Sequence, residues 1–116
     1  MDRQYELIIT IVNRGFADQV MDAAKKAGAR GGTVVYARGA GIHESETFFG
    51  LPIQPEKELV LTLVQRCQRN EIMAGICKVA GLSQPGKGLS FSLPVSHAVG
   101  INYIEDLKGC KDNEVQ

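Results

Sequence analysis

The chain has 116 residues, and its 13 Lys and Arg residues balance its 13 Asp and Glu residues, so the formal net charge is zero. This length predicts one domain with a modest core. The balanced charge, without a basic run or interleaved aromatic residues, argues against nucleic acid as a partner. No apolar stretch reaches the roughly 18 residues of a membrane span, and the first residues lead into a strand pattern instead of a signal peptide. We therefore expect a cytoplasmic protein without direct membrane insertion.

The cysteine and histidine residues do not predict a metal site. Cys67, Cys77 and Cys110 are odd in number and form no C-x-x-C pair, so we expect neither a disulfide framework nor a zinc knuckle, and we expect reduced thiols. His43 and His97 have no metal-binding partners at ligand spacing. We therefore expect no bound metal.

The first half of the chain predicts a strand, a helix, a strand and a long loop. Residues 6–12 are almost continuously apolar and run into a turn at 13–15, as a strand does. Apolar residues at helical spacing then predict a helix over 16–27, with Gly28 at its C-terminal end. Residues 33–37 form the second predicted strand. Residues 38–55 contain Gly, Ser and Pro without steady periodicity, and they are predicted to form a loop.

The second half repeats the strand and helix pattern. Residues 58–64 predict a third strand, residues 72–80 a helix that ends at Gly81, and residues 89–95 a fourth strand with Pro94 at its edge or end. The order predicts an α+β fold, the ferredoxin-like βαββαβ sandwich. In this fold both helices cover one face of a four-stranded antiparallel sheet.

The predicted sheet has a second face that two helices cannot cover. Residues 6–12 and 58–64 are apolar at nearly every position, and a soluble monomer does not tolerate a large uncovered apolar sheet. Cyclic association into a homotrimer covers this face. We expect Ile8, Val12, Val60 or Val64 to face the three-fold axis.

Two glycine-rich stretches stand beside the predicted strands, at 28–41 and 86–95. Glycine next to a β-branched run lets a ligand phosphate approach the backbone. In these stretches, and in the order of the elements from residue 5 to 101, the sequence resembles the PII signal-transduction proteins of nitrogen control and their PII-like relatives. The resemblance implies one PII-like domain over 1–116. Its parts are a long T-loop (41–55), a B-loop (82–88) and a C-terminal tail (102–116).

The resemblance implies a regulator and not an enzyme. It implies that an adenine nucleotide binds in the cleft between subunits, and that no cofactor is required. The T-loop is then expected to dock on a target protein, a membrane transporter or a metabolic enzyme, through His43, Glu44, Phe48 and Phe49. The nucleotide-binding residues that it implies are Arg38, Gly39, Ala40, Gly41, Lys57, Gly86, Lys87 and Gly88.

Several family phosphate ligands are replaced in this sequence. Leu89 stands where the resemblance places the B-loop lysine, and Gly100 and Asn102 stand where it places two arginines. Each charge-assisted hydrogen bond that is lost removes roughly 1.5–3 kcal/mol. We therefore expect AMP, ADP or a cyclic nucleotide to bind at least as tightly as ATP.

Other functions remain open on the residues alone. Residues 81–88 nearly match a P-loop, but they lack its hydroxyl and join a helix to a strand, so a Walker site is rejected. The alternative to a nucleotide sensor is a ferredoxin-like trimeric module for metal tolerance or small-molecule binding, without nucleotide binding. An enzyme is the third choice, because no nucleophile and base pair stands on rigid elements.

Overall fold

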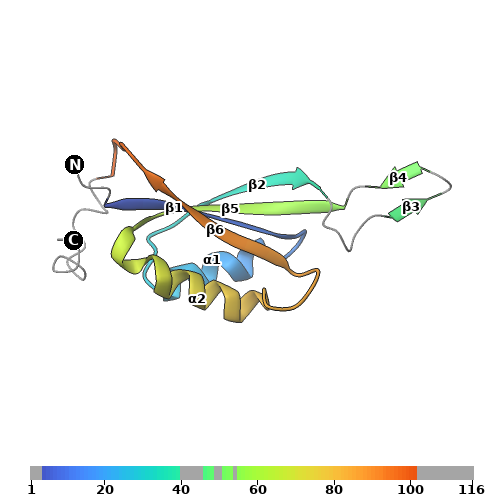
Figure 1. Cartoon of the computed structure of the whole chain (residues 1–116), viewed down its shortest axis with the longest axis horizontal. Helices are drawn as coiled ribbons and strands as arrows, with labels where there is room; N and C mark the ends of the chain where they lie inside the picture. Colours follow the sequence, from blue (N-terminus) through green and yellow to red (C-terminus); the bar gives the residue numbers. More distant parts are fainter. Residues whose placement is uncertain (1–3, 40–45, 49–50, 54, 102–116) are drawn as a thin grey trace.

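The fold is that of a four-stranded sheet covered by two helices, as seen in a computed structural model that describes residues 4–39, 46–48, 51–53 and 55–101. The sheet order is β2-β5-β1-β6, and every neighbouring pair is antiparallel. Figure 1 shows the elements in place. Their bounds are β1 (Tyr5–Asn13), α1 (Ala17–Lys26), β2 (Thr33–Arg38), β3 (Glu46–Phe48), β4 (Leu51–Ile53), β5 (Glu56–Gln65), the 3-10 turn η1 (Arg66–Gln68), α2 (Arg69–Ala80) and β6 (Gly88–Val95).

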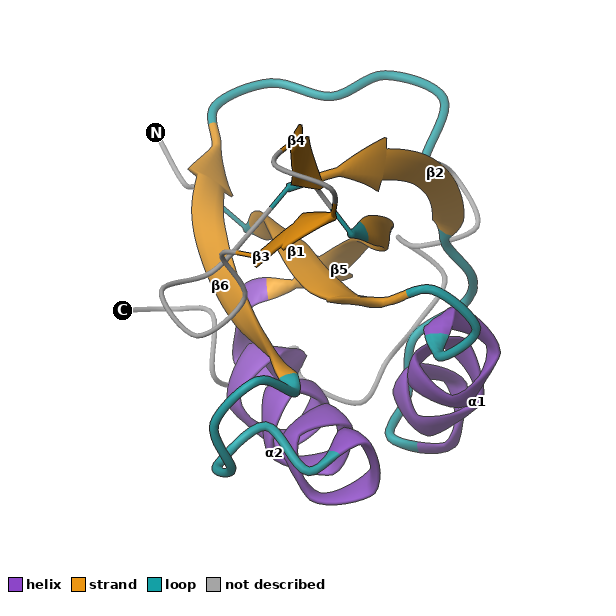
Figure 2. Ribbon diagram, turned by 90° about the vertical axis from the view of Figure 1, so that its right-hand side faces the viewer, coloured by secondary structure: helices purple, strands orange, loops and turns teal. Residues whose placement is uncertain are grey.

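Both helices lie on the same face of the sheet, as Figure 2 shows. The predicted α+β sandwich with its four antiparallel strands is therefore confirmed. Helix α2 begins one turn earlier than the apolar spacing predicted, because its first turn is polar. It ends where expected, at Gly81 in the left-handed conformation with φ +68°.

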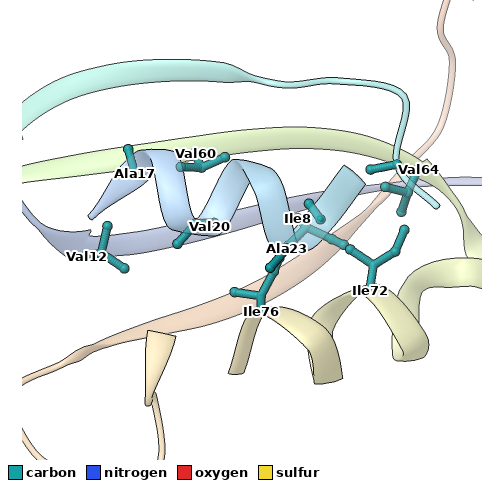
Figure 3. Close-up of a cluster of buried hydrophobic side chains, with 11 residues drawn as sticks. Ile8, Val12, Ala17, Val20, Ala23, Val60, Val64, Ile72 and Ile76 are labelled. Carbon is teal, nitrogen blue, oxygen red and sulfur yellow. The ribbon is translucent and has the colours of Figure 1, made fainter. Parts of the chain in front are cut away.

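The core lies between the sheet and the helices (Figure 3). Ile8 and Val12 of β1 and Val60 and Val64 of β5 are buried there against α1 and α2. The expectation that these residues face a three-fold axis was wrong. Strands that are apolar on both faces do not reveal by their periodicity which face the helices cover.

The opposite face of the sheet is a continuous apolar surface, which we call the outer face. Its residues on β1 alternate with the core residues, and the strand register places leucine or phenylalanine beside each of them. On β6 this face is exposed, with Phe91 at 37% and Leu89 at 52% of its accessible area. The outer face comprises Leu7, Ile9, Ile11, Leu59, Leu61, Leu63, Leu89, Phe91 and Leu93.

The T-loop contains regular structure that the sequence did not predict. Strands β3 and β4 pair antiparallel, with Glu46 opposite Ile53, and form a hairpin beyond the end of the sheet (Figure 1). Each strand has three residues. Such short strands carry too few residues for an alternating pattern to be recognised. The prediction of an irregular loop over 38–55 was therefore wrong in part, and Arg38 itself belongs to β2.

Candidate functional site

One end of the sheet brings together segments that are far apart in the sequence. The register places Ala37 of β2 opposite Lys57 of β5, and Asn13 of β1 opposite the same lysine. On the other side of β1, Val12 lies opposite Gly88, the first residue of β6. The base of the T-loop and the B-loop therefore lie at the same end of the sheet. This is the arrangement that a shared binding site needs.

A cavity of about 730 Å³ lies at this end of the sheet, and we call it the T-loop-base cavity. The predicted residues Arg38 and Lys57 both line it. Arg14 and Tyr36, which the sequence reasoning missed, also line it. Arg14 follows the last residue of β1 and was taken for a turn residue, and Tyr36 is a strand residue with 77% of its area exposed. The complete lining is Arg14, Tyr36, Ala37, Arg38, Glu56, Lys57 and Glu58.

The charges of this cavity favour an anionic ligand. Its two carboxylates already have partners, since Glu56 forms an ion pair with Arg14 and Glu58 accepts a hydrogen bond from the Ala17 backbone N–H at 2.9 Å. The hydrogen bond from Ala17 satisfies the first backbone N–H of α1 and places a carboxylate at the N-terminus of the helix. Glu58 is only 8% exposed, so this contact is buried. Three cations face two occupied carboxylates, so the cavity carries a net positive charge.

The backbone closes the base of the T-loop. The Gly39 N–H donates a hydrogen bond to the carbonyl oxygen of Pro55 at 3.1 Å, which joins the two ends of the loop just beyond the β2 and β5 pair. A Cβ at Gly39 would meet no atom within 4 Å. The base of the loop is therefore fixed by backbone hydrogen bonding, with open space beside Gly39.

The two glycines of the B-loop turn differ in what requires them. A Cβ at Gly88, where φ is +131°, would lie 2.2 Å from the carbonyl oxygen of Ile11. Gly86 has φ +79°, and a Cβ there would meet nothing within 4 Å. Glycine at 88 is therefore required by the close approach of β1. Glycine at 86 allows the positive φ of the turn, and the space beside it is open to a ligand.

Asn13 connects the two halves of this sheet end. Lys57 Nζ donates a hydrogen bond to Asn13 Oδ1 at 2.6 Å, and Asn13 Nδ2 donates one to the carbonyl oxygen of Gly86 at 3.0 Å. The side chain of Asn13 thus contacts both a cavity-lining cation and the B-loop. The sequence reasoning assigned it no role beyond a turn.

A second hollow, of about 490 Å³, lies at the opposite end of the sheet. Leu7, Leu61 and Leu63 of the outer face line it, together with the chain from Arg30 to Thr33. Glycine is required at 32, because a Cβ there would lie 2.9 Å from the Leu61 carbonyl oxygen. Three leucines give this hollow an apolar part, and Thr33 and the cationic Arg30 give it a polar part.

The remaining predicted site residues are distributed as follows. Lys87 is exposed in the turn between α2 and β6, and Phe48 lies in β3. The other five lie outside the described residues. They are Ala40, Gly41, His43, Glu44 and Phe49.

Among the described residues, no group of three or more His, Cys, Asp or Glu side chains is arranged to hold a metal ion. None of the helices in the described segments is long and apolar enough to cross a membrane. Cys77 is an exposed free thiol, whereas Cys67 is disulfide-bonded. The expectation of reduced cysteines was therefore wrong for Cys67, which lies in η1. Cys110 lies outside the described residues.

Comparison with known proteins identifies the family of this chain. No curated protein sequence matches it. The crystal structure of Arabidopsis thaliana PII bound to citrate is similar, with a TM-score of 0.67 and 26% sequence identity over 87% of this chain and 86% of that one. The family model of the nitrogen regulatory protein P-II matches residues 5–104. The chain therefore belongs to the nitrogen regulatory protein P-II family.

Proposed function

We propose that this protein is a PII-type regulator that senses an adenine nucleotide in a cleft between subunits and controls a target transporter or enzyme through its T-loop. Proteins of the P-II family are signal-transduction regulators. The observation that carries the proposal is the T-loop-base cavity, because it places Arg14, Arg38 and Lys57 where the loop leaves the sheet. A ligand bound there is in position to alter the base of the loop.

The proposed assembly is a homotrimer in which the outer faces turn inward. None of the described helices lies on this face, although it consists of leucine, isoleucine and phenylalanine. Burial of exposed apolar surface stabilises by about 25 cal/mol per Å². We propose that, in the trimer, the second hollow of a neighbouring subunit receives the base of the nucleotide. Leu61 and Leu63 of the outer face line this hollow and would contact the base.

The charge of the cavity favours a ligand with few phosphates. ATP carries about four negative charges, whereas AMP carries about two. Arg14, Arg38 and Lys57 face the two carboxylates of Glu56 and Glu58, which leaves a net charge of about one. Leu89 and Gly100 supply no cation at the places where the family uses one. AMP, ADP or a cyclic nucleotide is therefore proposed to bind at least as tightly as ATP.

The test is a calorimetric titration of the full chain with AMP, ADP, ATP and cyclic AMP. Arg38→Gln and Lys57→Met each remove one cation from the cavity and are expected to weaken binding by about 10- to 150-fold. Lys25→Met changes an exposed cation on α1, away from the cavity, and is the matched control, with affinity unchanged. If both cavity variants bind like the control, the ligand does not use this cavity.

A second titration addresses the alternative function. The similar Arabidopsis protein was solved with citrate bound, so the cavity is also to be tested with citrate alone. If no adenine nucleotide binds at millimolar concentration while citrate does, the chain is a small-molecule-binding module without nucleotide recognition. This outcome would replace the proposed function.

We propose that the protein is cytoplasmic and that its T-loop is the partner surface for a membrane transporter or a metabolic enzyme, with His43, Glu44, Phe48 and Phe49 as contacts. The hairpin of β3 and β4 beyond the sheet end supports this proposal, because it gives the loop a defined surface (Figure 1). Replacement of residues 43–49 by a Gly and Ser linker is expected to abolish capture of the target and to leave nucleotide affinity within about two-fold. Retained capture would place the target elsewhere on the protein.

A further inference from the structure

Asn13 is the last residue of β1, and β1 lies between β5 and β6 in the sheet. An amide side chain offers acceptor and donor atoms on opposite sides. Asn13 uses both. Its Oδ1 accepts from Lys57 Nζ on the β5 side at 2.6 Å, and its Nδ2 donates to the Gly86 carbonyl oxygen on the β6 side at 3.0 Å.

Each contact reaches a different part of the proposed site. Lys57 lines the T-loop-base cavity, and Gly86 belongs to the B-loop. In the described part of the chain, the other hydrogen bonds that the B-loop makes ahead of β6 are local. They run from Leu82 to Cys77, from Gln84 to Gly81 and from Lys87 to Gln84. The contact with Asn13 therefore ties this turn to the sheet.

We propose that Asn13 is a positioning residue that couples Lys57 to the B-loop. It holds the ammonium group of the cavity and the backbone of the turn in one hydrogen-bonded unit, so both are oriented before a ligand arrives. Preorganisation of this kind raises affinity because less order has to be gained on binding. The inference rests on the proposed function for its effect on affinity, but the coupling itself does not require any ligand.

Substitutions separate the two contacts. Asn13→Asp keeps an acceptor for Lys57 Nζ but loses the donor for the Gly86 carbonyl, whereas Asn13→Ala loses both. Lys57→Met removes the cation without changing any group that touches the turn. Lys25→Met, on the exposed side of α1, is the matched control. If Asn13→Ala fails to fold, Asn13→Ser, which is too short to reach both partners, takes its place.

The first experiment measures the coupling without ligand, from backbone amide resonances in the NMR spectrum of the full chain. We expect Asn13→Ala, Asn13→Asp and also Lys57→Met to shift the resonances of residues 86–88, and Lys25→Met to leave them unchanged. In the Asn13→Ala background, Lys57→Met should add no further shift there. If Lys57→Met leaves these resonances at their wild-type positions, Asn13 does not couple the two parts and the inference is overturned.

The second experiment measures AMP affinity by calorimetry in a double-mutant cycle. Asn13→Ala should weaken AMP binding about 3- to 10-fold in the wild-type background and by less than about two-fold in the Lys57→Met background. An equal loss in both backgrounds would mean a general structural role and would contradict the inference. If wild-type protein binds no nucleotide, the proposed function fails, and the NMR result alone decides the role of Asn13.

Discussion

Gly88→Ala tests the close approach between the start of β6 and the backbone of β1. A Cβ at this position would lie 2.2 Å from the Ile11 carbonyl oxygen, whereas ordinary contacts begin at 3.4 Å, so the two strands would have to move apart by about 1.2 Å. The contacted atom belongs to the backbone of Ile11, so no side-chain rotation relieves the overlap. The overlap occurs where Val12 pairs with Gly88 at the start of β6.

Two costs combine in this variant. Overpacking that forces backbone shifts costs about 1–3 kcal/mol. A residue other than glycine at φ +131° costs about 1–3 kcal/mol more. We therefore expect Gly88→Ala to lower the free energy of unfolding by about 2–6 kcal/mol. Gly86→Ala is the matched control, since only its φ of +79° is unfavourable, at about 1–2 kcal/mol.

The assay is urea unfolding followed by circular dichroism, at one protein concentration for all variants because the stability of an oligomer depends on concentration. The difference between the two alanine variants isolates the contact with Ile11 from the cost of positive φ. Equal unfolding midpoints for Gly88→Ala and Gly86→Ala would refute the reasoning. The close approach of β1 would then not be what requires glycine at 88.

Three further predictions concern assembly, the start of α1 and the cysteines. Light scattering should give a trimer mass for the wild type and a monomer mass for Phe91→Asp on the outer face, which should remain folded. Ile8→Asp places a charge in the core and should unfold the subunit. A monomer mass for the wild type at micromolar concentration would exclude the trimer. Glu58→Ala should cost about 1–3 kcal/mol in thermal or urea unfolding and Glu58→Gln less, because glutamine keeps an acceptor for the first amide of α1; equal losses would contradict the cap. Alkylation in denaturant, mapped by mass spectrometry, should label Cys77 before reduction and Cys67 only after it, and labelling of Cys67 before reduction would exclude its disulfide.

The sequence predicted the order of the elements, because the switch from strand to helix periodicity is marked by turns at each boundary. It did not predict which alternate side chains of β1 and β5 face the helices. In hindsight the signal was present, since the polar residues Glu6, Thr10, Glu58 and Thr62 all fall on the helix-facing side. The outer face carries only leucine and isoleucine on these strands. The more apolar face is thus the one that the helices do not cover.

Glu6, Thr10 and Glu58 on the helix-facing side have specific partners, whereas the buried Thr62 Oγ1 has no hydrogen-bond partner among the described residues. Glu6 forms an ion pair with Arg69 at 3.0 Å, and Thr10 Oγ1 lies 2.9 Å from Ser90 Oγ. These pairings join residues that are distant in the sequence, so no local sequence pattern predicts them. The apolar pattern of these strands alone could therefore not show which face the helices cover.

The candidate site was predicted in part. Arg38 and Lys57 were identified through the family resemblance, and both line the cavity. Arg14 was missed because a cation after a strand is ordinarily a solvated turn residue. Asn13 was missed because its role depends on two strand pairings at once, which only the three-dimensional register reveals.

The T-loop-base cavity is proposed to sense an adenine nucleotide with few phosphates. The measurement that tests this is the ratio of the dissociation constants of AMP and ATP for the wild-type protein, determined by calorimetry without Mg²⁺, so that the two ligands differ in charge. Three cations opposite two carboxylates predict that AMP binds at least as tightly as ATP. Tight binding of ATP together with weak binding of AMP would contradict this charge argument.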